Sequence, residues 1–241
     1  MSERNIQLLS DREHALKRAN VYIGSIKPIK EERYILENDK FVLKEIEYIP
    51  GLVKIFEEIL DNPVDYFVDN DMKAPKGKPT IKIELNDENF LIEDNGGGIP
   101  NKKVKDLQGK ERWMCEVAWS ELKAGSNFDD KNRKSAGTNG MGAALTNFFS
   151  KKFYAINCNG GLKIDCKWED NATKYKEKES KISKTGVSVY VEPDFEKFKR
   201  DKFTKNEKII IETRIKMLAY TYPEIKFILN SEQIDNKEID F

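Results

Sequence analysis

Three short segments, in a fixed order along the chain, constrain most strongly what this sequence can fold into. The first contains an acid and an amide, Glu58 and Asn62, within a stretch of helical pattern. The second runs from Asp94 to Pro100, and the third, residues 137–142, is rich in glycine. Glycines let backbone N–H groups approach a ligand closely. An acid–amide pair beside two glycine turns therefore predicts a nucleotide site.

Residues 52–68 are predicted to form a helix, because their apolar side chains recur on one face. Glu58 and Asn62 lie four residues apart, so they share a neighbouring face and can reach one ligand. A carboxylate can deprotonate a water, and an amide oxygen can ligate Mg²⁺. Two polar residues on a solvated helix face are the alternative. Pro63 predicts a bend that would displace the amide.

Residues 80–85 and 89–93 read as two strands of a hairpin, separated by turn-forming residues. Asp94 ends the second strand, the glycines from Gly96 to Gly98 free the backbone, and Pro100 stops regular structure. A carboxylate there can accept a hydrogen bond from an adenine amino group. An ordinary strand-exit turn is the alternative.

The third segment follows a polar stretch, residues 125–135, and leads into a predicted helix at residues 143–149. Exposed backbone N–H groups and the positive end of a helix dipole suit phosphates. No Lys-Ser/Thr pair follows, as a Walker loop requires, and no βαβ unit with a ribose-binding acid is apparent.

In this order, the three segments resemble the N box and the two glycine boxes of the GHKL ATPases, the superfamily of gyrase, histidine kinases and MutL. Residues 9–25 look like the opening of a type IIA DNA topoisomerase ATPase domain, and residues 48–55, 126–130 and 139–150 are closest to its tailed-bacteriophage and eukaryotic forms. The resemblance covers essentially the whole chain.

This resemblance implies a role for individual residues. Glu58 would be the general base, Asn62 the Mg²⁺ ligand and Asp94 the adenine anchor. The residues implied to contact ATP are Asn62, Asp65, Ile92, Asp94, Gly96, Gly98, Ile99, Pro100, Ser126, Asn127, Gly137, Thr138, Asn139, Gly140, Met141, Gly142 and Val189. Ile59 would join Ile92, Ile99, Pro100 and Val189 around the base, although plain core positions explain these apolar residues too.

Three departures from the family pattern predict a working but slow ATPase. Gly97 stands where relatives commonly have a basic residue, and Ala144 stands where the eukaryotic enzymes have a lysine near the phosphates. Val187 replaces a threonine that helps gyrase-like relatives to hold adenine. Two cationic contacts are therefore missing.

The predicted fold is α+β: a two-layer α/β sandwich of the GHKL (Bergerat) type, with a mixed, mostly antiparallel sheet and helices on one face. A length of 241 residues suits one such domain. Residues 1–25 are expected to be an N-terminal arm with a short helix, and residues 26–241 the ATPase domain, without transducer and DNA-cleavage domains. Further strands are predicted at residues 153–156, 162–168 and 186–191, and a helix at residues 205–221.

The family implies ATP and Mg²⁺ as cofactors. It also implies an ATP-bound homodimer that gates DNA strand passage, together with the other topoisomerase domains or subunits. Basic and acidic residues balance at 42 each, so DNA would be met through the full enzyme. Three cysteines and one histidine lack metal-ligand spacing. Without a signal peptide or membrane-length apolar run, the cytoplasm is expected, that of the host for a phage-encoded protein.

Two other functions stay open. The first is a clamp module of chaperone or mismatch-repair type that uses the same pocket. The second is a regulatory partner of a topoisomerase that binds ATP but has lost hydrolysis.

Overall fold

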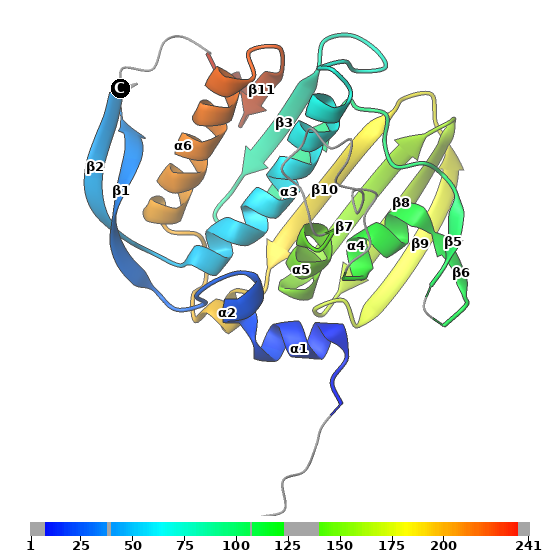
Figure 1. Cartoon of the computed structure of the whole chain (residues 1–241), viewed down its shortest axis with the longest axis horizontal. Coiled ribbons are helices and arrows are strands. Elements are labelled where there is room, and N and C mark those ends of the chain that lie inside the picture. Colours follow the sequence, from blue (N-terminus) through cyan, green and yellow to red (C-terminus); the bar gives the residue numbers. More distant parts are fainter. Residues whose placement is uncertain (1–7, 38–39, 107, 123–139, 236–241) are drawn as a thin grey trace, which may run out of the picture.

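A computed structural model describes residues 8–37, 40–106, 108–122 and 140–235. An eight-stranded sheet has the strand order β12-β11-β3-β4-β10-β7-β8-β9. All neighbouring strands pair antiparallel except β11 and β3, which are parallel. Helices α3, α4, α5 and α6 lie on one face of the sheet (Figure 1). The predicted α+β sandwich is therefore confirmed.

The strands of this sheet are β3 (Thr80–Leu85), β4 (Phe90–Asp94), β7 (Ser150–Asn159), β8 (Leu162–Glu169), β9 (Lys174–Lys181), β10 (Gly186–Pro193), β11 (Lys226–Leu229) and β12 (Glu232–Gln233). Two small antiparallel pairs stand apart, β1 (Ile29–Glu37) with β2 (Lys40–Tyr48) and β5 (Lys103–Lys105) with β6 (Glu111–Trp113). The helices are α1 (Asp11–Lys17), α2 (Ala19–Tyr22), α3 (Pro50–Asp69), α4 (Met114–Ser120), α5 (Gly142–Phe148), the 3₁₀ helix η1 (Phe195–Phe198) and α6 (Lys205–Thr221).

Helix α3 crosses the sheet at its centre and supplies much of the core. Ile55, Phe56 and Phe67 are fully buried, and each such side chain stabilises the fold by about 2 kcal/mol. Phe56 packs edge to face against Phe90 of β4, with ring centroids 4.9 Å apart. Pro63 lies inside α3 and does not end it. The helix therefore keeps Glu58 and Asn62 on consecutive turns.

Buried hydrogen bonds tie α5 and α6 to α3. Helix α6 begins at a capping box formed by Thr204 and Glu207. The other oxygen of the Glu207 carboxylate accepts a hydrogen bond from the Ile49 amide, 2.9 Å away, at the start of α3. Thr146 of α5 donates its hydroxyl to the Ile55 carbonyl oxygen, 3.0 Å away. These bonds fix α5 and α6 against α3 on either side.

Candidate functional site

Glu58 lies on α3 and faces the first residue of α5, Gly142. A Cβ atom built on Gly142 would lie 1.7 Å from Glu58 Oε2, so a side chain there would displace the Glu58 carboxylate. The other carboxylate oxygen, Oε1, lies 2.5 Å from the Lys54 ammonium, one helical turn earlier. The Glu58 side chain is 23% exposed, so water can reach it. A half-buried carboxylate thus stands at the N-terminus of a helix that follows a glycine segment.

Asn62 follows Glu58 by one turn of α3 and is exposed. Its neighbour Asp61 turns toward α6 and pairs with Arg214 at 3.1 Å. Asp65 is half-buried on the same helix. The Asn62 amide is therefore accessible from the same side of α3 as the Glu58 carboxylate.

Asp94 ends β4, opposite Ile81 of β3. Burial raises the pKa of the Asp94 carboxyl to about 6, against the lowering effect of the backbone N–H groups of Gly96 and Val187. The Gly96 N–H donates to Asp94 Oδ1 over 2.7 Å. Gly186 has φ 123°, and a Cβ there would lie 2.1 Å from the Asp94 carbonyl oxygen. The backbone around this acid therefore requires glycine on two sides.

The turn after Asp94 packs tightly against two residues that sequence reasoning missed. A Cβ on Gly96 would lie 2.7 Å from the ring of Tyr66, and one on Gly97 would lie 2.7 Å from the Tyr66 hydroxyl. Tyr66 thus fills the space that a basic side chain at position 97 would need. The buried Asn157 side chain accepts from the Ile99 N–H at 2.8 Å and donates to the Ile99 carbonyl at 2.7 Å.

Gly98 completes this turn. It has φ 71°, and a Cβ there would lie 2.5 Å from the Cys158 carbonyl oxygen. A side chain at this position would therefore push the turn away from β7.

The apolar residues expected around a base differ in their exposure. Ile92 and Val189 stand opposite each other on β4 and β10 and are buried. Ile99 is half-buried and packs on the core, whereas Pro100 is exposed. Ile59 is 1% exposed and belongs to the core.

Of the third segment, the described part consists of Gly140, Met141 and Gly142. Gly140 has φ 57°, and Met141 is half-buried at the start of α5. Ala144, the residue noted above as standing in place of a lysine, is fully buried in α5, so it is a packing position here. The predicted site residues Ser126, Asn127, Gly137, Thr138 and Asn139 lie outside the described residues.

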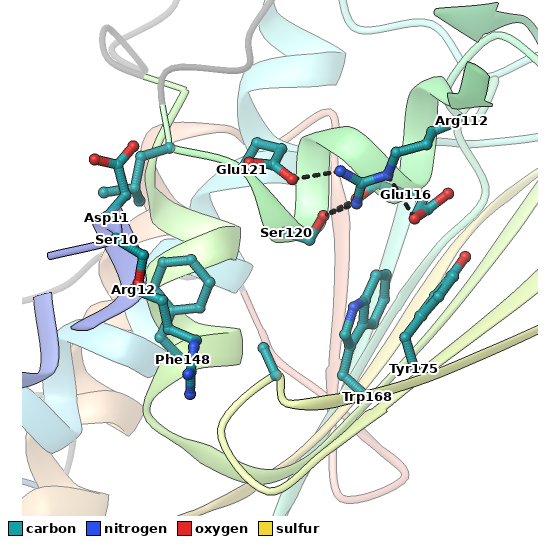
Figure 2. A pocket seen from close by; sticks show the side chains of 12 residues that line it. Ser10, Asp11, Arg12, Arg112, Glu116, Ser120, Glu121, Phe148, Trp168 and Tyr175 are labelled. Carbon is teal, nitrogen blue, oxygen red and sulfur yellow. Dashed lines mark hydrogen bonds and ion pairs between the residues drawn. The ribbon is translucent and has the colours of Figure 1, made fainter. Parts of the chain in front are cut away.

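A separate cavity of about 300 Å³ lies between the start of α1, the end of α4 and the β8–β9 hairpin (Figure 2). The Arg112 guanidinium lies between Glu116 and Glu121 and binds Ser120 at 2.6 Å. These bonds fix the end of α4. Neither Glu58, Asn62, Asp94 nor Gly142 lines this cavity, so it is distinct from the candidate site.

Among the residues that the structure describes, His, Cys, Asp and Glu form no group of three that could hold a metal ion. In the same part of the chain, every helix is too short or too polar to cross a membrane.

Comparisons with known proteins show the family to which the chain belongs. A family model described as histidine kinase-, DNA gyrase B-, and HSP90-like ATPase matches residues 47–197, and the chain belongs to this family. The chain is 34% identical to the DNA topoisomerase large subunit of Enterobacteria phage T4, over 97% of this chain and 44% of that subunit.

Solved structures give the same result. The ATPase region of Saccharomyces cerevisiae topoisomerase II matches 95% of this chain, and 61% of that chain is covered, with a TM-score of 0.82 and 26% identity. The ATPase and transducer domains of topoisomerase II from Balamuthia mandrillaris match 95% of this chain, and 60% of that chain is covered, with a TM-score of 0.85 and 26% identity. The chain is thus homologous to the ATPase region of type II topoisomerases, and it spans less than half of the phage subunit that it matches.

Proposed function

We propose that this chain binds ATP with Mg²⁺ and hydrolyses it as the N-terminal ATPase domain of a type II DNA topoisomerase. The observation that carries the proposal is the approach of Glu58 to Gly142, where a carboxylate meets the N-terminus of α5. Asp94 lies on the neighbouring β4, with glycines packed around it. In this proposal Asp94 is the hydrogen-bond acceptor for adenine, and the N-terminus of α5 provides backbone N–H groups for the phosphates. Glu58 is the carboxylate that activates the attacking water.

Each residue has a defined task in this proposal. The Asp94 carboxylate accepts a hydrogen bond from the adenine amino group, between the apolar side chains of Ile92 and Val189. The N-terminus of α5 provides backbone N–H groups and a positive dipole end for the phosphates. Glu58 takes a proton from the water that attacks the terminal phosphate.

The Asn62 amide fits a hard cation, because it is exposed and near Glu58. Bound Mg²⁺ would neutralise phosphate charge there. Asp65 lies three residues after Asn62 on α3 and is half-buried. It would orient the Asn62 side chain and the neighbouring waters. Ser126, Asn127 and residues 137–139 would hold ribose and phosphates, as in the family resemblance.

The larger role also follows from the relatives. ATP binding would join two copies of the domain, and hydrolysis would reset this gate for DNA strand passage in the full enzyme. The other topoisomerase domains or subunits would be its partners. The similarity to the phage T4 subunit favours a phage-type protein that acts in the host cytoplasm.

Glu58→Gln tests the role of the base. We expect phosphate release to fall by about 100-fold or more, within the range for loss of a general base, while binding of a non-hydrolysable ATP analogue stays within about twofold of the original. Steady-state phosphate release and equilibrium analogue binding measure the two effects. ATP-dependent phosphate release that persists in the variant would show that another residue is the base. Tight binding without turnover in the unmodified chain, even with a transducer domain fused to it, would favour the hydrolysis-deficient regulatory partner.

A further inference from the structure

Asn157 is a polar residue at a core position of β7. It alternates with Phe153 and Ala155 on one face of the strand, and all three residues are fully buried. Burying an amide costs free energy unless its donors and its acceptor find partners. The partners of this amide therefore explain its place in the core.

Those partners belong to the glycine turn after Asp94. Asn157 Oδ1 accepts a hydrogen bond from the Ile99 N–H at 2.8 Å, and Asn157 Nδ2 donates to the Ile99 carbonyl at 2.7 Å. Nδ2 also donates to Asn101 Oδ1 at 3.0 Å. An N–H needs an acceptor and a carbonyl needs a donor, so the amide has one orientation. The side chain thus pairs with Ile99 as a neighbouring strand would.

A second asparagine of β7 holds the same turn from two residues further along the strand. Asn159 donates to the Gly97 carbonyl at 2.7 Å. Asn101 in turn donates to the carbonyl oxygens of Asn159 and Leu162. Every second residue of the turn, from Gly97 through Ile99 to Asn101, is therefore hydrogen-bonded to the end of β7 or to the start of β8.

Asn157 is also in register with a residue that holds Asp94. It stands opposite Val187 of β10, and the Val187 N–H is one of two backbone groups that bond the Asp94 carboxylate. A Cβ on Gly98 would lie 2.9 Å from Asn157 Oδ1, so the turn lies directly against the amide. Asn157 thus connects the strand beside Asp94 with the turn that carries Ile99.

We propose that Asn157 is a positioning residue for the base of the nucleotide and sets the preference for adenine, an inference that rests on the proposed function of Asp94 and Ile99. The amide fixes the Ile99 backbone relative to Asp94. Adenine has an amino group that can donate to the Asp94 carboxylate, whereas guanine has a carbonyl oxygen at the same ring position. The carboxylate rejects guanine as long as the turn stays in place, because the two acceptors are then left unpaired.

The test measures the ratio of the dissociation constants of non-hydrolysable GTP and ATP analogues, together with kcat and KM for ATP hydrolysis. Asn157→Leu keeps the approximate size of the side chain but removes both bonds to Ile99. We expect KM to rise about tenfold and the ratio to fall about tenfold, as for unpaired buried groups, while kcat stays within about twofold. Asn159→Ala releases only the Gly97 carbonyl and is expected to lower the ratio about threefold.

Asn230→Gly is the matched control, because Asn230 pairs in the same way with a strand backbone outside the proposed site. Its Oδ1 accepts from the Leu85 N–H at 2.9 Å and its Nδ2 donates to the Leu85 carbonyl at 3.5 Å. Leu85 lies at the opposite end of β3 from the residue that faces Asp94. Asn230 has φ 48°, which glycine adopts readily. The change should lower Tm and leave the ratio, KM and kcat as they are.

Thermal unfolding of each variant separates positioning from stability. A folded Asn157→Leu with an unchanged ratio, or with equal losses of affinity for both analogues, would overturn the inference. If Asn157→Leu does not fold, the ratio in Asn159→Ala decides in the same way. Failure of the proposed function would look different: the unmodified chain would bind no ATP analogue, or would bind both analogues equally well, and the inference would fall with it.

Discussion

At the level of single residues, Asp94 combines a cost in stability with the adenine-binding role proposed for it. Its pKa of about 6 means that the folded protein holds this proton more tightly than the unfolded chain does. The ionised carboxylate therefore destabilises the fold above pH 6, and this penalty fades as the pH falls from about 6 to about 4. Such a penalty is typical of a site that keeps a charge for a ligand.

Asp94→Asn removes this charge and keeps an oxygen that can accept from Gly96. We expect the variant to raise the free energy of unfolding at pH 7 by about 1–2 kcal/mol, less than the full shift of pKa implies. It should also weaken binding of an ATP analogue by tenfold or more, because an amide is a poorer acceptor for the adenine amino group. Urea unfolding at pH 7 and at pH 4 measures the first effect, and the gain should vanish at pH 4. An equal gain at both pH values would contradict the account.

Ligand binding should share this pH dependence. As the pH falls through about 6, Asp94 becomes protonated and is a weaker acceptor, so analogue affinity should fall by up to about tenfold per pH unit below that point. Fluorescence titration between pH 5 and pH 8 measures the change. The Asp94→Asn variant is the control, since its affinity should vary only through protonation of the ligand. A parallel decline in both proteins would remove Asp94 as the cause.

At the level of elements, the junction of α3 and α5 is the tightest part of the site. Gly142→Ala would place a Cβ 1.7 Å from Glu58 Oε2. We expect a loss of stability of about 1–3 kcal/mol from this overpacking and a fall in ATP turnover of tenfold or more. The double variant Gly142→Ala with Glu58→Ala removes the clash and should regain most of the stability. Additive losses in the double variant, measured by thermal unfolding, would show that the two residues do not touch.

The elements that could be predicted from sequence are those with a clear alternation or helical period. The hairpin of β3 and β4 and the helix α6 lie where the pattern placed them. Strand β9, with the sequence KYKEKESK, was missed because it is an edge strand with charged side chains on both faces. Strands β5 and β6 were missed too, since three residues are too few for a period.

The same limit applies within the site. Glu58, Asn62 and Asp94 could be named because each lies in a local motif. Tyr66 and Asn157 could not, because their contacts with the glycine turn join distant parts of the chain, 58 residues apart for Asn157 and Ile99. Only the fold brings these partners together.

At the level of the whole molecule, α3, α5 and the strands β4 and β10, which carry the proposed site residues, belong to one two-layer fold with the helices on a single face of the sheet (Figure 1). Sheet and helices share one core, so a ligand that bridges Asp94 and α5 would brace both layers at once. In the proposed function, hydrolysis, dimerisation and a role in DNA strand passage would all depend on nucleotide binding.

Isothermal titration of the unmodified chain with a non-hydrolysable ATP analogue and Mg²⁺, at two temperatures, tests this property most directly. We predict saturable heat with one site per chain, and its loss when Asp94→Asn replaces the unmodified chain at the same concentrations. The absence of any saturable heat at both temperatures, at high protein concentration, would contradict the assignment of a nucleotide site to this fold.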